Sequence, residues 1–187
     1  MVRKIKSCVF ISGNGSNMLS IIKSSREYNF PIKIELIISN NLNAKGLVYA
    51  KKYSIPYKYI SSKDKIKFER ECLFFLKKKK IKFICLAGFM QKLSKKFLRS
   101  LNYRIINIHP SLLPKYKGLN TYKRVLNSGE KYAGSTVHFV TEKLDSGQII
   151  LKKKVLIDRN ETENSLKKKV LNQEYKLYPQ SIISVFK

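Results

Sequence analysis

Short apolar runs rich in β-branched residues recur along this chain and alternate with stretches of helical periodicity. Each run is too short for a buried helix, which points to strands. The clearest predicted strands cover residues 5–11, 32–38, 81–86 and 104–108. Strands that alternate with helices are typical of α/β proteins with parallel sheets. The sequence therefore predicts an α/β fold with a mostly parallel sheet, and its length favours one domain over residues 1–187.

A first helix is predicted to begin at residue 16. Further helices are predicted over residues 43–53, 63–80, 94–100, 119–127 and 160–186. A short strand is expected at 57–60. Two later strands, 134–141 and 149–157, have no long helix between them, so this edge of the sheet should be mixed or antiparallel. Pro179 lies inside the last helix and predicts a kink or a restart there.

The chain is strongly basic, with 39 Lys and Arg against 12 Asp and Glu and a net charge of +27. Such a charge would fit a nucleic-acid-binding protein. However, the lysines are scattered, alanine is rare and Ile, Asn, Lys and Tyr are abundant, as expected from a genome biased toward A and T. We favour compositional bias, expect no specific nucleic-acid partner, and expect a positive field that attracts small anions.

The three cysteines, Cys8, Cys72 and Cys85, show no CxxC spacing, and two of them lie in apolar runs. This pattern favours core packing over a disulfide framework or a zinc site. No apolar run reaches the roughly 18–20 residues that a membrane span needs. The apolar run at 8–11 is shorter than a signal-peptide core, so we expect a cytoplasmic protein without a membrane partner.

A glycine-containing turn, GNGSN at 13–17, joins the first predicted strand to the first helix. Backbone N–H groups at a helix N-terminus favour an anion such as a single phosphate. The third glycine of a dinucleotide motif is absent. An ordinary turn capped by Asn14 or Ser16 explains the same residues equally well.

Both histidines of the chain lie between residues 107 and 147. Asn107 and His109 are two residues apart at a strand end, so they point to the same face. An amide, an imidazole and the carboxylate of Asp145 would suffice to polarise a carbonyl and move a proton. A buried structural role for His109 is the alternative. We expect His138 to support the site or to pack in the core, and two histidines without helical spacing predict no catalytic metal.

Five segments of the chain resemble the folate-dependent formyltransferase family, over nearly the whole length. They are ISGNGSNMLSII at 11–22, LAGFMQKLS at 86–94, NIHPSLLPKYKG at 107–118, STVHFVTEKLDSG at 135–147 and NQEYKLYP at 172–179. The resemblance implies a three-layer Rossmann-like fold with helices on both faces of the sheet. It also implies transfer of a formyl group from 10-formyltetrahydrofolate, as co-substrate, to the amine of glycinamide ribonucleotide in de novo purine biosynthesis.

The same resemblance implies roles for individual residues. Asn107, His109 and Asp145 would be catalytic, with Asp145 favouring the charged imidazole. The nucleotide would be held by Gly15, Ser16, Asn17 and Glu174. The folate would be bound by Lys65, Met90, Gln91, Lys92, Leu93, Asn107, Thr141, Glu142 and Leu144. Plain core packing is the alternative for Met90 and Leu93. The protein would be a monomer or a weak homodimer that binds an anionic ribonucleotide and a folate.

The chain departs from the family pattern at a few positions. Gln91 and Lys65 stand where the family usually has Arg, so we expect a carboxylate to be bound more weakly or in a different geometry. Lys117 replaces a Pro, and Asn120 and Tyr122 stand where His is common. Two relatives of the same fold are the alternatives: a formyltetrahydrofolate hydrolase, and a methionyl-tRNA formyltransferase. Both usually carry an extra domain, so we expect neither.

Overall fold

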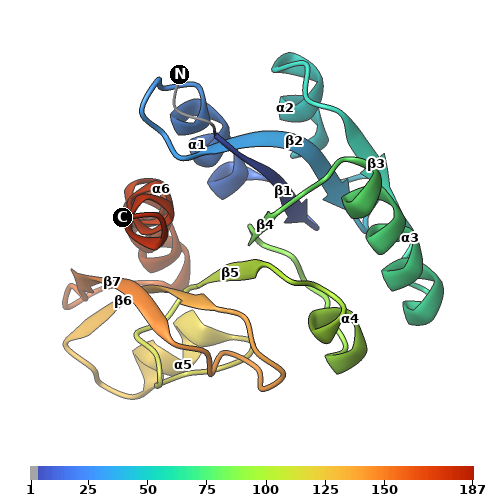
Figure 1. Cartoon of the computed structure of the whole chain (residues 1–187). Coiled ribbons are helices and arrows are strands. Elements are labelled where there is room, and N and C mark those ends of the chain that lie inside the picture. The colour runs from blue at the N-terminus through green and yellow to red at the C-terminus, as the bar shows by residue number, and fades with distance from the viewer. Residues whose placement is uncertain (1–3) are drawn as a thin grey trace. The chain divides into compact units, whose positions relative to one another are not determined.

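The structure is a computed structural model that describes residues 4–187, and its packing forms two compact units, Met1–Ile106 and Asn107–Lys187. Seven strands in the described residues form one sheet in the order β3-β2-β1-β4-β5-β6-β7, with helices around it (Figure 1). The sheet is mostly parallel and has an antiparallel edge. The α/β prediction is confirmed, including the changed direction at the late edge.

In the first unit, β1 (Ile5–Ile11) pairs in parallel with β2 (Ile32–Ser39) and with β4 (Phe83–Leu86), and β2 pairs in parallel with β3 (Tyr57–Tyr59). The helices of this unit are α1 (Ser16–Ser25), α2 (Leu47–Lys52), α3 (Lys65–Lys78) and α4 (Lys95–Arg99). Each connects consecutive strands, as parallel pairing requires.

The central strands of the first unit are buried along most of their length, because helices and loops cover both of their faces. Cys8, Cys72 and Cys85 are free and buried, as core packing predicts. Burial is the main cause that raises the pKa of the Cys8 thiol well above its usual value. These thiols are core residues and poor nucleophiles.

β5 (Arg104–His109) ends in the second unit, where α5 (Thr121–Asn127), β6 (Tyr132–Phe139), β7 (Ile149–Leu156) and α6 (Glu163–Val185) follow. β6 and β7 pair antiparallel. Helix α6 packs on both strands. The packed core of this unit contains Val125, Ala133, Val155, Leu166 and Val170. Among the helices of residues 4–187, none combines the length and apolar character needed to cross a bilayer.

Some boundaries differ from the sequence prediction. α2 begins at Leu47, not at 43, because Asn41 accepts the N–H of Asn43 through its Oδ1 atom (3.0 Å) and keeps these residues in a turn. β6 begins and ends two residues earlier than expected. The predicted restart at Pro179 is wrong, since α6 is one helix to Val185. Pro179 is buried in that helix, and its neighbours' packing outweighs one missing backbone hydrogen bond.

Candidate active site

The end of β5 and the turn after β6 supply the predicted catalytic side chains of the second unit. Asn107 and His109 lie two residues apart on β5, so the pleat directs them to one face. His138 lies on β6, and Asp145 follows in the turn before β7. Asp145 adopts a left-handed conformation with φ of 46°, which Asp tolerates better than most residues.

The structure brings these four side chains together. Nδ1 of His109 lies 3.4 Å from Oδ2 of Asp145. Nε2 of His138 lies 3.4 Å from Nδ2 of Asn107 and 3.7 Å from Oδ1 of Asp145. His109, His138 and Asp145 are buried, with exposed fractions of 6%, 2% and 8%. The carboxylate therefore lies between two imidazoles, with the amide beside one of them.

His138 is a neutral hydrogen-bond acceptor toward this cluster. Its Nδ1 atom lies 2.8 Å from the carbonyl oxygen of Phe139, which can only accept, so Nδ1 carries the hydrogen. Burial lowers the pKa of His138 below its usual value, despite the opposing effects of Phe139 and Asp145. The 3.7 Å approach to Asp145 is therefore no ion pair at neutral pH. The free lone pair on Nε2 faces the amide N–H of Asn107.

Two backbone groups complete the surroundings of His109 and Asp145. The carbonyl oxygen of Tyr116 lies 2.9 Å from Nε2 of His109, and the N–H of Gly118 donates to Oδ2 of Asp145 at 2.9 Å. Acceptors next to both ring nitrogens of His109 fit a ring with hydrogen on each. Sequence reasoning missed these two residues, because backbone atoms leave no signature in residue type.

The turn that carries Asp145 is tied to neighbouring segments. Nζ of Lys117 donates to Oγ of Ser146 at 2.6 Å. A Cβ atom at Gly147 would stand 1.7 Å from the carbonyl oxygen of Phe139, so no other residue fits there. That same carbonyl binds His138, so Gly147 lets the turn lie directly against the site.

In the first unit, the GNGSN turn leads into α1. Gly15 is the N-cap residue, with φ of 69°, and its Cβ would lie 2.7 Å from Cα of Gly46. Ser16 and Asn17 form the first turn of the helix. Within residues 4–187, no side chain caps α1, so the alternative in which Asn14 or Ser16 is the cap is wrong. A helix start without a side-chain cap or acidic residues in its first turn suits an anion.

The segment predicted to bind folate in this unit is held by serines at both ends. Ser12 Oγ accepts the N–H of Met90 at 2.8 Å, and Ser94 binds both carboxylate oxygens of Glu69. Met90 is 68% exposed, so the alternative that it is a core residue is wrong, whereas Leu93 is buried. Gln91, Lys92 and Lys65, the first residue of α3, are exposed.

The remaining predicted binding residues lie in the second unit. Leu144 is 53% exposed in the turn after β6, close in sequence to Thr141 and Glu142. Glu174 is buried on α6. Burial, and then the charge of Glu174, raise the pKa of Tyr122 on α5. Among the described residues, no group of three or more His, Cys, Asp or Glu side chains could hold a metal ion.

Comparison with known proteins places this geometry in a family. Residues 5–182 match the family model described as formyl transferase. The chain belongs to the formyl transferase family. The match covers both compact units, and the enzyme class that the sequence resemblance implied is confirmed.

Relatives of this formyl transferase carry more specific names. A phosphoribosylglycinamide formyltransferase from Haemophilus influenzae is 40% identical over 177 residues, which cover 93% of this chain and 84% of the relative. The human trifunctional purine biosynthetic protein adenosine-3 is 39% identical over 183 residues, but the chain spans only 18% of that protein's length.

A solved structure agrees with the fold of this formyl transferase. The crystal structure of phosphoribosylglycinamide formyltransferase from Anaplasma phagocytophilum superposes with a TM-score of 0.93 at 36% identity. The match covers 99% of this chain and 88% of that one.

Proposed function

We propose that the protein transfers the formyl group of 10-formyltetrahydrofolate to the amine of glycinamide ribonucleotide, a step of purine biosynthesis. The observation that carries the proposal is the cluster of Asn107, His109 and Asp145, in which the imidazole lies beside a buried carboxylate and the amide contacts the neighbouring His138. Membership of the formyl transferase family and relatives named phosphoribosylglycinamide formyltransferase support the choice of both substrates.

The proposed reaction begins when the amine nitrogen attacks the formyl carbon and the carbonyl electron pair moves to oxygen. Asn107 donates a hydrogen bond to that oxyanion, and such a donor is typically worth about 10²–10³ in rate. The positive charge of the His109 ring, whose two N–H groups face Asp145 and Tyr116, stabilises the same oxyanion electrostatically. A proton passes from the attacking nitrogen to N10 of the folate as the carbon–N10 bond breaks. The products are the formylated nucleotide and tetrahydrofolate.

Asp145 and His138 orient His109 and Asn107 in this proposal. The Asp145 carboxylate lies next to Nδ1 of His109 and stabilises positive charge on the ring. His138 accepts one amide hydrogen of Asn107, which leaves the second hydrogen for the formyl oxygen. In this proposal His138 supports the site and does not act on the substrate.

Binding roles complete the proposal. Gly15, Ser16 and Asn17 bind the nucleotide phosphate at the start of α1, and the buried Glu174 binds the glycinamide group. The folate contacts Met90, Leu93 and the turn at Thr141, Glu142 and Leu144. Exposed Lys65 and Lys92, with Gln91, face its carboxylates. The lysines lack the planar fork of Arg, so we expect their binding of the folate carboxylates to weaken as salt increases. We also propose that the protein is cytoplasmic and that it is a monomer or a weak homodimer. Residues 1–187 act as one domain in this proposal.

Steady-state turnover of the purified protein tests this function. We expect tetrahydrofolate to form only when glycinamide ribonucleotide is present, with one formylated nucleotide for each folate consumed. Release of formate without an amine acceptor would instead support a formyltetrahydrofolate hydrolase. Folate binding by folded protein without any turnover would contradict both activities.

A further inference from the structure

The segment from Tyr116 to Leu119 supplies backbone atoms to two residues of the proposed catalytic cluster. The Tyr116 carbonyl accepts from Nε2 of His109, and the Gly118 N–H donates to Asp145, both at 2.9 Å. Neither contact uses a side chain of the segment. The position of the segment's backbone therefore sets both contacts, and the group that holds this backbone also controls the geometry of the cluster.

One cation on α5 holds this backbone from the outside. Nη1 of Arg124 donates to the carbonyl oxygen of Lys117 at 2.6 Å and lies 3.4 Å from that of Leu119. The guanidinium carbon of Arg124 also lies 5.5 Å from the centre of the Tyr116 ring. A planar guanidinium can bind carbonyl groups and cover an aromatic ring at the same time, which a lysine cannot do equally well.

The backbone conformation of the segment depends on contacts that hold it in place. Tyr116, its first residue, and Asn120, which follows it, both have a φ of 55° in the left-handed region. Non-glycine residues in this region cost free energy and persist only when surrounding contacts hold them. Arg124 reaches both sides of the bend, because its partners are the ring of Tyr116 and the carbonyls that follow it.

We propose that Arg124 is a positioning residue for formyl transfer, which clamps residues 116–119 so that their backbone orients His109 and Asp145. This inference rests on the proposed function. Arg124 acts through the Tyr116 carbonyl and the Gly118 N–H and donates nothing to the reacting atoms itself. Its side chain is exposed, so its replacement removes the clamp without opening the core.

A comparison of Arg124→Gln with Lys123→Gln tests the clamp. Both variants remove one positive charge from neighbouring exposed positions of α5. We expect Arg124→Gln to lower kcat on the order of tenfold and to leave KM for either substrate within about twofold. The reason is that misplacement of His109 and Asp145 slows the reaction more than it weakens substrate binding. Lys123→Gln should match the parent protein. Arg124→Lys should recover part of the rate, since lysine can bind one carbonyl but covers the ring poorly.

A second readout does not depend on turnover. The chain has only two histidines, so the ring nitrogen signals of His109 and His138 can be assigned by NMR. We expect Arg124→Gln to shift the His109 signals and to leave those of His138 nearly unchanged. Altered His109 signals in a protein without turnover would keep the clamp and reject the proposed function.

The clamp is overturned if the parent turns over and Arg124→Gln matches Lys123→Gln in both kcat and the His109 signals. An equal loss of kcat in both variants would also overturn it, since that result reflects lost charge alone. Should Arg124→Gln fold poorly, Arg124→Lys carries the comparison. Parent-like kcat and His109 signals in that variant would reject the role of the guanidinium.

Discussion

The two histidines of this chain differ in what their ring nitrogens meet. Both nitrogens of His109 face acceptors, namely the carboxylate of Asp145 and the carbonyl of Tyr116. His138 instead donates to the Phe139 carbonyl and presents a lone pair to Asn107. His109 is thus arranged to donate, whereas His138 is arranged to hold a donor in place.

Replacement of Asp145 by Asn tests the carboxylate without changing its shape. We expect Asp145→Asn to lower kcat about 100-fold or more, because the charge beside His109 is lost, while Kd for each substrate changes by less than about threefold. Single-turnover kinetics and equilibrium titration measure the two quantities. Lys143→Gln, an exposed change in the same turn, is the control and should behave like the parent. A rate within a few-fold of the parent would remove Asp145 from the mechanism.

His138 should make stability depend on pH. Because its pKa is lowered in the folded protein, the unfolded chain binds more protons at and below the usual histidine pKa, so stability falls with falling pH. We expect His138→Gln to reduce the slope of the free energy of unfolding against pH by up to about 1.4 kcal/mol per pH unit. Urea unfolding of both proteins at pH 7.5, 6.5 and 5.5 measures it. Equal slopes in the two proteins would show that folding does not lower the pKa of His138.

At the level of elements, α3 and α4 are joined through one pair of residues next to the exposed segment at Met90–Lys92. The N–H and Oγ of Ser94 donate to Glu69 on α3 at 2.6 Å and 2.5 Å. The same Oγ accepts the N–H of Phe97 at 3.0 Å and caps α4. One serine thus starts a helix and fixes the segment that precedes it.

Loss of this serine should destabilise the fold. We expect Ser94→Ala to lower the free energy of unfolding by about 1–2 kcal/mol, since it removes a helix cap and leaves a buried carboxylate with one partner fewer. Ser94→Thr keeps the hydroxyl and should retain most of the stability. Urea denaturation of the three proteins provides the comparison. Equal stability of Ser94→Ala and the parent would show that the cap contributes nothing.

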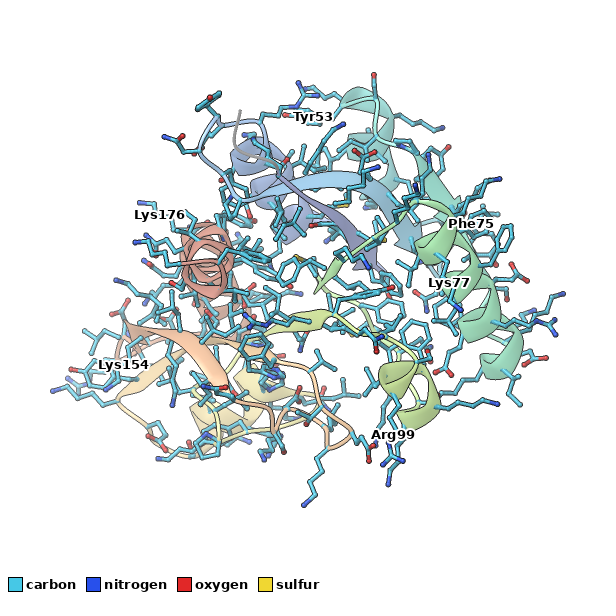
Figure 2. The ribbon with its side chains drawn as sticks, in the orientation of Figure 1. Tyr53, Phe75, Lys77, Arg99, Lys154 and Lys176 are labelled. Carbon is cyan, nitrogen blue, oxygen red and sulfur yellow. The ribbon has the colours of Figure 1, made fainter. Side chains whose placement is uncertain are left out.

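For the whole molecule, the net charge of +27 is spread over many elements. Lys154 on β7 and Lys176 on α6 lie at the outer edge of the drawing, on two separate elements (Figure 2). Scattered lysines produce a general positive field more readily than a shaped binding surface. We expect such a field to attract the anionic substrates of the proposed function and also to bind nucleic acid without specificity.

Salt should separate these two consequences. We expect labelled duplex DNA to bind in low salt and to lose most of its affinity near 150 mM salt, because the release of counterions dominates non-specific binding. Fluorescence anisotropy across a salt series measures this loss. Tight binding that persists at 150 mM salt would revive the nucleic-acid hypothesis.

Local patterns in the sequence were sufficient for the strands, the helices and the shared face of Asn107 and His109, because the period of a strand is a property of neighbouring residues. Helix ends were less certain, since the turn at Asn41–Asn43 and the burial of Pro179 depend on distant packing. Residue types also indicated His138 and Asp145 as site residues. They did not predict which nitrogen or oxygen atom of each residue contacts which partner.

Only the tertiary structure decided how His109 and Asp145 are held. Their partners at Tyr116 and Gly118 are backbone atoms, which every non-proline residue carries, so residue type could not reveal them. Arg124 is an exposed arginine like any other until its carbonyl partners are known. Residue types determine which chemical groups are available, whereas long-range packing determines where the chain brings a backbone carbonyl to a ring nitrogen.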